Sequence, residues 1–272
     1  MPSFSSRTIV YKGLFNAPQL DKFYTDLQSP LFETALAIFH QRYSTNTFPN
    51  WQLAQPFRMV AHNGEINTLI GNKNWTRARE LELRSEVWGD NVEHLMPILQ
   101  PEVSDSACID NALETLELSG RDNIHAAMML APEAWEKKKD LPRELEGFYK
   151  YHACLNEPWD GPASIAFTDG KYIGAVLDRN GLRPSRYYVT NDARVIMASE
   201  VGVLPVPAEI VVQKGRLQPG RMFLVDFEEG RIVPEQELKQ STAKARPYGS
   251  WLQKQRIELS DLSPGQNSQG FD

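Results

Sequence analysis

The sequence contains very little cysteine, and this scarcity excludes several classes of protein. Only Cys108 and Cys154 occur among its 272 residues. Two thiols cannot form a disulfide-rich scaffold, and they cannot supply the four ligands of a typical structural zinc or iron–sulfur site. The five histidines are scattered, without the HxxxH spacing of a helical metal site. We therefore expect no metal centre and only two candidates for a thiol nucleophile.

Long apolar runs and basic runs are also missing. No stretch approaches the roughly 20 apolar residues of a membrane-spanning helix, and the N-terminal segment lacks the apolar core of a secretory signal. Lysine and arginine number 29 against 35 acidic residues, which gives a formal charge of −6. We therefore expect no membrane and no nucleic-acid partner. The expected location is the cytoplasm, or a plastid if the chain comes from a photosynthetic eukaryote with a leader upstream.

The remaining composition is that of a globular protein, with 41% hydrophobic and 24% charged residues. In the first half, alternating or apolar runs predict strands at residues 7–11 and 58–61, and a buried strand that ends near Arg42, where a helix start is the alternative. Helices are predicted at residues 75–88, 104–120 and 141–156. In the clearest of these, apolar residues recur from Ile109 at helical spacing, with Asp105 or Ser106 as the N-cap.

The second half has the pattern of an antiparallel sheet. Residues 164–168 and 172–177 flank an Asp169-Gly170 turn, and similar hairpins are predicted around Asn191 and Gly230. Strands that follow a helical middle predict an α+β domain over residues 1–233. Residues 234–272 are polar and charged, which is typical of a linker or an extension toward another module.

Two polar clusters lie at the ends of predicted strands in the first half. In HQRYSTNT, Arg42 offers a planar fork for a carboxylate and Thr45 adds a hydroxyl, with a surface salt bridge as the alternative. In HNGEINT, the side-chain amide of Asn63 and the backbone N–H of Gly64 could converge on one oxyanion. The alternative for that dipeptide is a plain hairpin turn.

Two further clusters follow. Asp105, in SDSA, could accept hydrogen bonds from a ligand ammonium, or could simply cap a helix. The stretch DRNGLRPSRYY is interpreted as a structural turn in which Arg183 is tied to a carboxylate. Cys108 and Cys154 lie in predicted helices, so we expect buried and unreactive thiols.

Five stretches together resemble the class II glutamine amidotransferase domain of glutamate synthases. They occur in the order HQRYSTNTFPNW, HNGEINTLIGNKNW, QPEVSDSACIDN, EPWDGPASIAFTDG and DRNGLRPSRYYVT. The tail KARPYGSWLQKQRIELSDL is similar to the linker that leads to the synthase half of such enzymes. The resemblance implies an Ntn-hydrolase fold, a four-layer αββα sandwich with antiparallel sheets, here lacking its first strands.

The resemblance also implies roles for individual residues. Arg42 matches the arginine that holds the α-carboxylate of L-glutamine, with Thr45 in the same loop, and Asp105 matches the carboxylate that holds the α-ammonium. Asn63 and Gly64 match the oxyanion-hole pair. The family hydrolyses L-glutamine to glutamate and ammonia. In the full-length enzyme, a synthase domain of the same chain with FMN and an iron–sulfur cluster uses the ammonia to aminate 2-oxoglutarate, and no cofactor is expected in this segment.

One departure from the family pattern shapes the functional expectation. Family members attack the amide with an N-terminal cysteine, whereas this chain opens with Met1 and has no cysteine before Cys108. We therefore expect a C-terminal portion of the domain that does not hydrolyse glutamine alone and folds only marginally, because missing strands leave unpaired edges. The alternative is a non-catalytic glutamine-binding or interaction module with the same fold. Another class II amidotransferase is a third interpretation.

Overall fold

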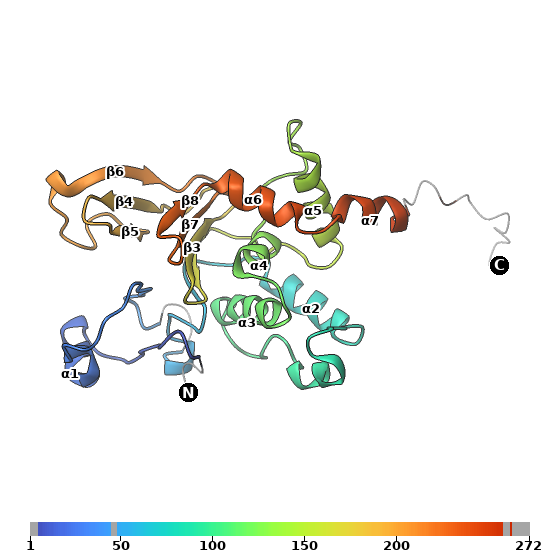
Figure 1. Cartoon of the computed structure of the whole chain (residues 1–272). Helices are drawn as coiled ribbons and strands as arrows, with labels where there is room; N and C mark the ends of the chain where they lie inside the picture. Colours follow the sequence, from blue (N-terminus) through green and yellow to red (C-terminus); the bar gives the residue numbers. More distant parts are fainter. Residues whose placement is uncertain (1–4, 45–47, 258–261, 263–272) are drawn as a thin grey trace.

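Two antiparallel sheets form the framework of the protein (Figure 1). The computed structural model describes residues 5–44, 48–257 and 262. The larger sheet has the order β1 (Val60–Gly64), β2 (Ala163–Thr168), β3 (Tyr172–Leu177), β7 (Met222–Asp226), β8 (Arg231–Val233). The smaller sheet has the order β5 (Val195–Ala198), β4 (Arg186–Thr190), β6 (Val211–Arg216). The predicted α+β class is confirmed.

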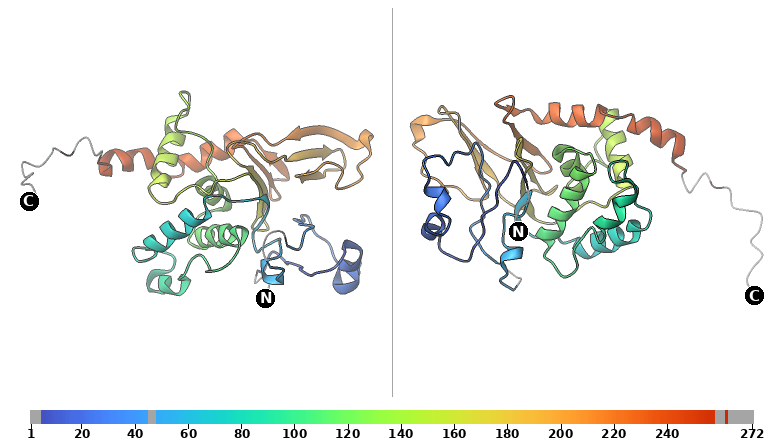
Figure 2. Two further views of the ribbon diagram at one scale, coloured as in Figure 1. Left: turned by 180° about the vertical axis from the view of Figure 1, so that it is seen from behind. Right: turned by 60° about the horizontal axis from the view of Figure 1, so that its bottom comes forward.

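Most of the helices gather on one side of the larger sheet, whereas the first lies apart from it, beside the N-terminal segment (Figure 2). The helices of the described residues are α1 (Leu20–Phe23), α2 (Leu69–Glu80), α3 (Asp105–Leu118), α4 (Asn123–Leu130), α5 (Arg143–Ala153), α6 (Glu235–Lys244) and α7 (Tyr248–Gln255). Five short 3-10 segments accompany them: Ala17–Gln19, Thr25–Gln28, Trp51–Leu53, Gly89–Leu95 and Ala208–Ile210. Within the described part of the chain, no helix is long and apolar enough to cross a membrane.

The alternation of side chains along the strands divides the apolar residues between two cores. On one face, Met222 and Leu224 of β7 join the main core against the helices. On the other face, Ala175 and Leu177 of β3 pack with Phe223 and with Met197 of the smaller sheet. Successive strand residues point to opposite faces, so one sheet separates a helical layer from a second sheet. A side chain of β1 can therefore face either the helical layer or the second sheet, depending on its position along the strand.

The predicted hairpins are confirmed. At the turn between β2 and β3, the side chain of Asp169 accepts the backbone N–H groups of Lys171 and Tyr172 at 2.8 and 2.9 Å, and Gly170 has φ 86°. The sequence did not reveal β6, because its side chains are mostly exposed and carry no apolar alternation. Its register is set by pairing with β4, which is a tertiary contact.

The two strands predicted before residue 45 are wrong. Residues 7–11 and the segment that ends near Arg42 have no regular structure in the described chain. Ile9 is 70% exposed and Phe39 is 60% exposed, although Val10 is buried, so burial matches the apolar pattern only in part. A strand is stable only when a neighbouring strand satisfies its backbone groups, and neither segment belongs to either sheet within the described residues.

The helix predicted at residues 75–88 lies earlier in the chain, as α2. Buried Asn72 donates to the carbonyl of Pro158 at 3.2 Å, and Arg79 pairs with Glu157. The contact of Asn72 stabilises a helix start that is poor in helix-forming residues, and that of Arg79 holds the last turn. At the other end, the carboxylate of Glu80 accepts the backbone N–H of Ile98 at 2.8 Å. The helix ends there, and a short 3-10 segment follows at Gly89–Leu95.

The N-cap of α3 also differs from the prediction. Ser104, rather than Asp105 or Ser106, accepts the backbone N–H of Ala107, at 3.2 Å. Because the cap is supplied one residue earlier, the carboxylate of Asp105 lies in the first turn and makes other contacts. The tertiary surroundings of the helix start decide between three adjacent polar residues that all suit an N-cap.

The polar segment after residue 233 forms helices in its first part. Along α6 and α7, which follow one another across α5 (Figure 1), the side chains of Leu238, Ala243 and Tyr248 are buried. Gly147 on α5 allows a close approach, since a Cβ there would lie 2.9 Å from the backbone nitrogen of Gly249. Residues 235–255 are therefore packed onto the domain, and an extension from there toward a synthase domain stays a prediction.

Two histidines meet between α4 and α5. The ring nitrogens Nε2 of His125 and His152 are 2.8 Å apart, and Nδ1 of His152 lies 2.8 Å from the carbonyl oxygen of Phe148. Nδ1–H of His152 must donate to that carbonyl, so its Nε2 accepts from His125. Burial, reinforced by the charge of Arg121, lowers the pKa of His125 to about 4 and that of His152 to about 3. Arg246 lowers the pKa of His125 further.

These two histidines should make the protein less stable in mild acid. Both titrate near 6.5 when unfolded, so between about pH 6.5 and pH 4 they bind more protons in the unfolded state than in the folded state. Two extra protons give a slope that approaches about 2.7 kcal/mol per pH unit. Urea unfolding from pH 7.5 to 4.5 measures this slope, with a His125→Gln/His152→Gln variant as the reference. Equal slopes in the two proteins would contradict the prediction.

Candidate functional site

Two loops that are distant in sequence are joined at the end of β1. The backbone N–H of Asn67 donates to the carbonyl of Asp160 at 2.8 Å, and that of Glu65 donates to the carbonyl of Pro162 at 3.2 Å. At Gly64, where φ is 139°, a Cβ would lie 1.8 Å from the carbonyl oxygen of Pro162. Only glycine allows this approach, so the HNG and EPWDGPA stretches are held together as one unit.

Asn63 is held on both sides of its side-chain amide. Arg183 donates from Nη2 to the Oδ1 atom of Asn63 at 2.6 Å, and Nδ2 of Asn63 donates to Oγ of Ser199 at 3.0 Å. Arginine has no acceptor, so it determines which end of the amide faces it. One N–H of Nδ2 remains in addition to the one given to Ser199. The amide is thus oriented before any ligand arrives.

The contact of Arg183 corrects the sequence interpretation of its loop. The turn is structural, because the carboxylate of Asp178 accepts the backbone N–H groups of Asn180 and Leu182 at 3.1 Å each. The guanidinium of Arg183, however, contacts an amide oxygen on β1 rather than a carboxylate. Sequence could not reveal this contact, since 120 residues separate the two partners.

Asp105 lies beside the same strand end, on the helix side. Its Oδ2 accepts the backbone N–H of Ile66 at 2.8 Å, and its Oδ1 accepts the backbone N–H of Ser106 at 2.7 Å. The side chain is 22% exposed, so a ligand can reach it. The structure therefore brings Asn63, Gly64 and Asp105 to the C-terminal end of β1.

Arg42 is connected to this group less directly. Its carbonyl oxygen lies 2.8 Å from Nδ1 of His40. Burial lowers the pKa of His40, the hydrogen bond with the carbonyl of Arg42 opposes this, and the positive charge of Arg42 adds to the lowering. His40 in turn acts on the pKa of His62, the first residue of the HNG motif. Arg42 itself is exposed, and its connection to the site within the described residues runs through His40. Thr45 lies outside the described residues.

Sequence reasoning missed Asp110, a buried carboxylate on α3. Its Oδ1 accepts the backbone N–H groups of Met59 and Val60 at 2.9 and 3.1 Å, and its Oδ2 lies 3.3 Å from Nε of Arg58. Burial raises the pKa of Asp110, and these hydrogen bonds oppose that rise. The signal in the sequence is an acidic residue within the apolar side of a predicted helix. Asp110 attaches the start of β1 to α3.

The two thiols differ in their surroundings. Cys108 is fully buried in α3, as expected, and burial raises the pKa of its thiol. Cys154 is exposed at the end of α5, which corrects the expectation of a buried thiol, and its Sγ lies 3.4 Å from the carbonyl of Lys150. The helix ends one residue earlier, at Ala153, so this side chain points to solvent.

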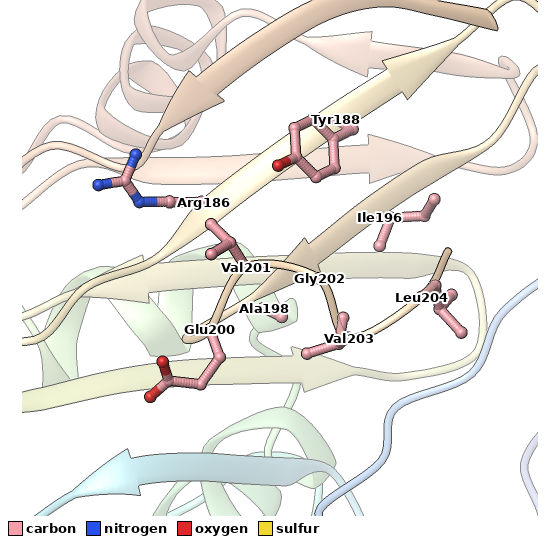
Figure 3. A pocket seen from close by; sticks show the side chains of 9 residues that line it. All are labelled: Arg186, Tyr188, Ile196, Ala198, Glu200, Val201, Gly202, Val203 and Leu204. Atoms are coloured by element: carbon pink, nitrogen blue, oxygen red, sulfur yellow. The ribbon is translucent and has the colours of Figure 1, made fainter. Parts of the chain in front are cut away.

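Two small hollows are too small for an amino-acid ligand. One lies under the loop that follows β5, where Arg186, Glu200 and Leu204 surround about 10 Å³ (Figure 3). That volume is about one water probe. The other, of about 50 Å³, is bordered by Trp135 and Tyr149. Neither hollow is lined by Asn63 or Asp105, so the polar cluster at the end of β1 stands apart from both.

The family of this chain follows from the comparison with known proteins. The family described as "Glutamine amidotransferases class-II" matches residues 1–251. Since this match covers most of the sequence, the chain belongs to the class II glutamine amidotransferases. A solved glutamine phosphoribosylpyrophosphate amidotransferase from Bacillus subtilis aligns with 70% of the chain and 32% of its own length, at 18% identity and a TM-score of 0.39.

Within that class, the chain is similar to glutamate synthases. It is 52% identical to the glutamate synthase [NADPH] large chain of Bacillus subtilis, over 95% of this chain. It is 51% identical to the glutamate synthase [NADH] of Saccharomyces cerevisiae and to the chloroplastic ferredoxin-dependent glutamate synthase of Oryza sativa, in each case over 96% of this chain. The chain spans only 17%, 12% and 16% of the length of these three relatives.

Proposed function

We propose that this chain is the glutamine-binding part of a glutamate synthase amidotransferase domain. In this proposal, Asp105 holds the α-ammonium of L-glutamine and Arg42 holds its α-carboxylate, with Thr45 in the same loop. Asn63 and Gly64 donate hydrogen bonds to the oxyanion that forms on the amide carbon. The observation that supports the proposal most is the meeting of an oriented Asn-Gly pair and an accessible carboxylate at one strand end.

The charges of the proposed site match the ligand. L-glutamine is a zwitterion with a neutral amide, so it requires one anion, one cation and donors aimed at the amide oxygen. Asp105 supplies the anion and Arg42 the cation. The charge of Arg183 polarises the amide of Asn63, which strengthens the N–H that remains for the substrate. Such donors act most strongly when charge develops on the substrate oxygen.

The ammonia would be used outside this chain. In the proposal, hydrolysis of L-glutamine to glutamate supplies ammonia to a synthase domain of the same parent protein, for reductive amination of 2-oxoglutarate. FMN and an iron–sulfur cluster would be held there, because two cysteines are too few to ligate a cluster. The proposed fold is the Ntn-hydrolase sandwich, and the proposed compartment is the cytoplasm or a plastid.

The nucleophile is proposed to be a thiolate other than those of this chain. Cys108 is buried with a raised pKa, and Cys154 lies on the exposed end of α5. A reactive cysteine needs a lowered pKa together with access to the substrate. We therefore expect no turnover of glutamine by the isolated polypeptide. A non-catalytic glutamine-binding module is the second candidate function, and it is favoured by these thiol positions.

Ligand binding tests the proposed site without requiring turnover. Isothermal titration of the purified chain should show L-glutamine binding more tightly than 4-carbamoylbutanoate, which lacks the ammonium, and 4-aminobutanamide, which lacks the carboxylate. Asp105→Asn should weaken L-glutamine by about tenfold or more, because a hydrogen bond to a charged group contributes about 1.5–3 kcal/mol. The same change should leave 4-carbamoylbutanoate almost unaffected.

The matched control is Asp140→Asn, which removes an exposed carboxylate from a loop. It should leave the affinity for all three ligands unchanged. Absence of L-glutamine binding at millimolar concentration, or equal binding of the three ligands, would overturn the proposed function.

A further inference from the structure

Three polar side chains form a chain of hydrogen bonds that leads from β1 to the carboxylate of Asp105. Nε2 of His62 lies 2.5 Å from Oγ of Ser106, and that Oγ lies 3.2 Å from Oδ1 of Asp105. His62 points to the helix side of β1, opposite to its neighbour Asn63, because successive strand residues face opposite ways. The proposed ammonium and oxyanion positions are therefore supported by two consecutive residues of β1 whose side chains point to opposite faces.

The direction of these hydrogen bonds follows from counting donors. Ser106 has one hydroxyl proton, and the carboxylate of Asp105 can only accept, so the hydroxyl donates to Asp105. His62 must then donate from Nε2–H to the hydroxyl oxygen. The other ring nitrogen, Nδ1, is buried without a partner within the described part of the chain. An unpaired lone pair there is less costly than an unpaired N–H, which favours the same tautomer.

The imidazole of His62 is held in the neutral form. Burial lowers its pKa and outweighs the opposing charge of Asp105, and the proximity of His40 and Arg183 adds to the lowering. A neutral ring donates to Ser106 without placing a second cation beside the carboxylate that is proposed to bind the ligand ammonium. The negative charge of Asp105 thus stays available to a ligand.

These residues do not form a hydrolytic serine triad. In such a triad the acid holds the histidine through Nδ1, while Nε2 takes the proton of the serine. Here Asp105 is 3.9 Å from Nε2, on the same side as the serine. Ser106 is only 7% exposed and lies in the first turn of α3. Its hydroxyl is therefore a link within the protein rather than a nucleophile.

The exposure of the three side chains separates their roles. His62 is 1% exposed, whereas Asp105 is 22% exposed, so the ligand can contact the carboxylate but not the ring behind it. We propose that His62 and Ser106 are positioning residues, which hold the carboxylate of Asp105 in the orientation that binds the α-ammonium of the ligand. This inference rests on the proposed glutamine site.

The anchoring of His62 makes such a role physically effective. Its backbone N–H donates to Oε1 of Gln55 at 2.6 Å, and its backbone pairs with Ile165 in β2. The backbone that carries the imidazole ring is therefore held in place. Without the hydroxyl of Ser106, the carboxylate of Asp105 keeps the backbone N–H of residue 106 on Oδ1 and that of Ile66 on Oδ2, but it loses the side-chain donor, so its orientation is held less firmly. Affinity for the ammonium should fall, while the amide and carboxylate ends of the ligand are untouched.

The experiment measures how much the ammonium contributes to binding. For each variant of the full chain, titration calorimetry gives the ratio of the Kd for 4-carbamoylbutanoate to the Kd for L-glutamine. Ser106→Ala and His62→Met should lower this ratio by about tenfold, the value of one hydrogen bond to a charged group. Ser106→Thr keeps the hydroxyl and His62→Gln keeps a donor near the position of Nε2, so both should stay within about twofold of the parent chain.

A matched control separates positioning from general damage. Ser241→Ala removes a hydroxyl that donates to the carbonyl of Leu238 on α6, and it should leave the ratio unchanged. Thermal unfolding confirms that each variant is folded before titration. If Ser106→Ala weakens both ligands equally, Ser106 is only structural and the inference is overturned. An unchanged ratio in Ser106→Ala and His62→Met overturns it as well.

The parent chain distinguishes this inference from the proposed function. If the parent chain does not prefer L-glutamine over 4-carbamoylbutanoate, Asp105 does not bind an ammonium, and both proposals are overturned. If the preference is present and survives Ser106→Ala, only the positioning role is overturned. A preference that is lost in Ser106→Ala and His62→Met but kept in Ser106→Thr and His62→Gln supports both.

Discussion

Lys239→Met should lower the free energy of unfolding by about 3 kcal/mol, because it breaks a buried ion pair on one side only. Lys239 and Glu133 are both buried, and Nζ of Lys239 lies 2.7 Å from Oε1 of Glu133 and 2.7 Å from Oε1 of Glu235. Burial alone would raise the pKa of Glu133, yet the hydrogen bonds from Lys138 and Lys239 hold it below its ordinary value. The carboxylate therefore stays charged and needs its partners.

The loss should be visible first in α6 and α7. Lys239 lies on α6 and Glu133 lies in the loop after α4, so the pair attaches the C-terminal helices to the domain. Hydrogen exchange should accelerate across residues 235–255, and the melting temperature should fall by about 6–12 °C. The matched control is Lys150→Met, which removes an exposed partner of Glu146 on α5. A melting temperature equal to that of the control would contradict the prediction.

Asp110→Ala should cost about 3 kcal/mol, and its effect should reach the candidate site. The change leaves the buried backbone N–H groups of Met59 and Val60 without their acceptor, at about 1–3 kcal/mol each. These residues begin the segment that carries His62, Asn63 and Gly64. The lost carboxylate lies where β1 joins α3. The backbone of β1 should therefore be held less firmly, including the end that carries the site residues.

A closer replacement separates the hydrogen bonds from the charge. In Asp110→Asn, the side-chain oxygen can still accept both backbone N–H groups, whereas the new amide group would face Nε of Arg58. We expect this variant to lose about 1 kcal/mol, well below the loss in Asp110→Ala. Denaturant unfolding compares the two variants. Equal losses would show that the charge, rather than the acceptor at the strand start, stabilises this junction.

Local sequence patterns predicted the elements that short-range interactions are sufficient to define. The hairpin from β2 to β3 was predicted because an Asp-Gly turn and flanking apolar runs suffice to define it. By contrast, residues 7–11 carry a strand pattern without a strand, since pairing with another segment decides whether an apolar run becomes β-structure. The same reason explains why β6 was missed. Its polar sequence forms a strand only because β4 offers an edge.

The candidate site was likewise predicted only in part. Asn63, Gly64 and Asp105 were proposed from their chemistry, and the structure brings them to one strand end. The groups that orient them were not found. Arg183 was assigned to a carboxylate, and Ser106 was considered only as a cap. Residue types indicate what a side chain can do, but the partner that orients it lies far away in sequence.

The scarcity of cysteine had a consequence that no folding detail alters. Two cysteines in 272 residues are too few for a disulfide scaffold or for the four thiolate ligands of a typical iron–sulfur cluster. The sequence by itself also determined the α+β class, the hairpins and the motifs of a class II amidotransferase, because these depend on composition and short-range pattern. Tertiary structure alone decided that Cys154 is exposed, that Arg183 holds Asn63, and that His62 reaches Asp105 through Ser106. Burial and long-range hydrogen bonds exist only after the chain has folded, so no local pattern encodes them.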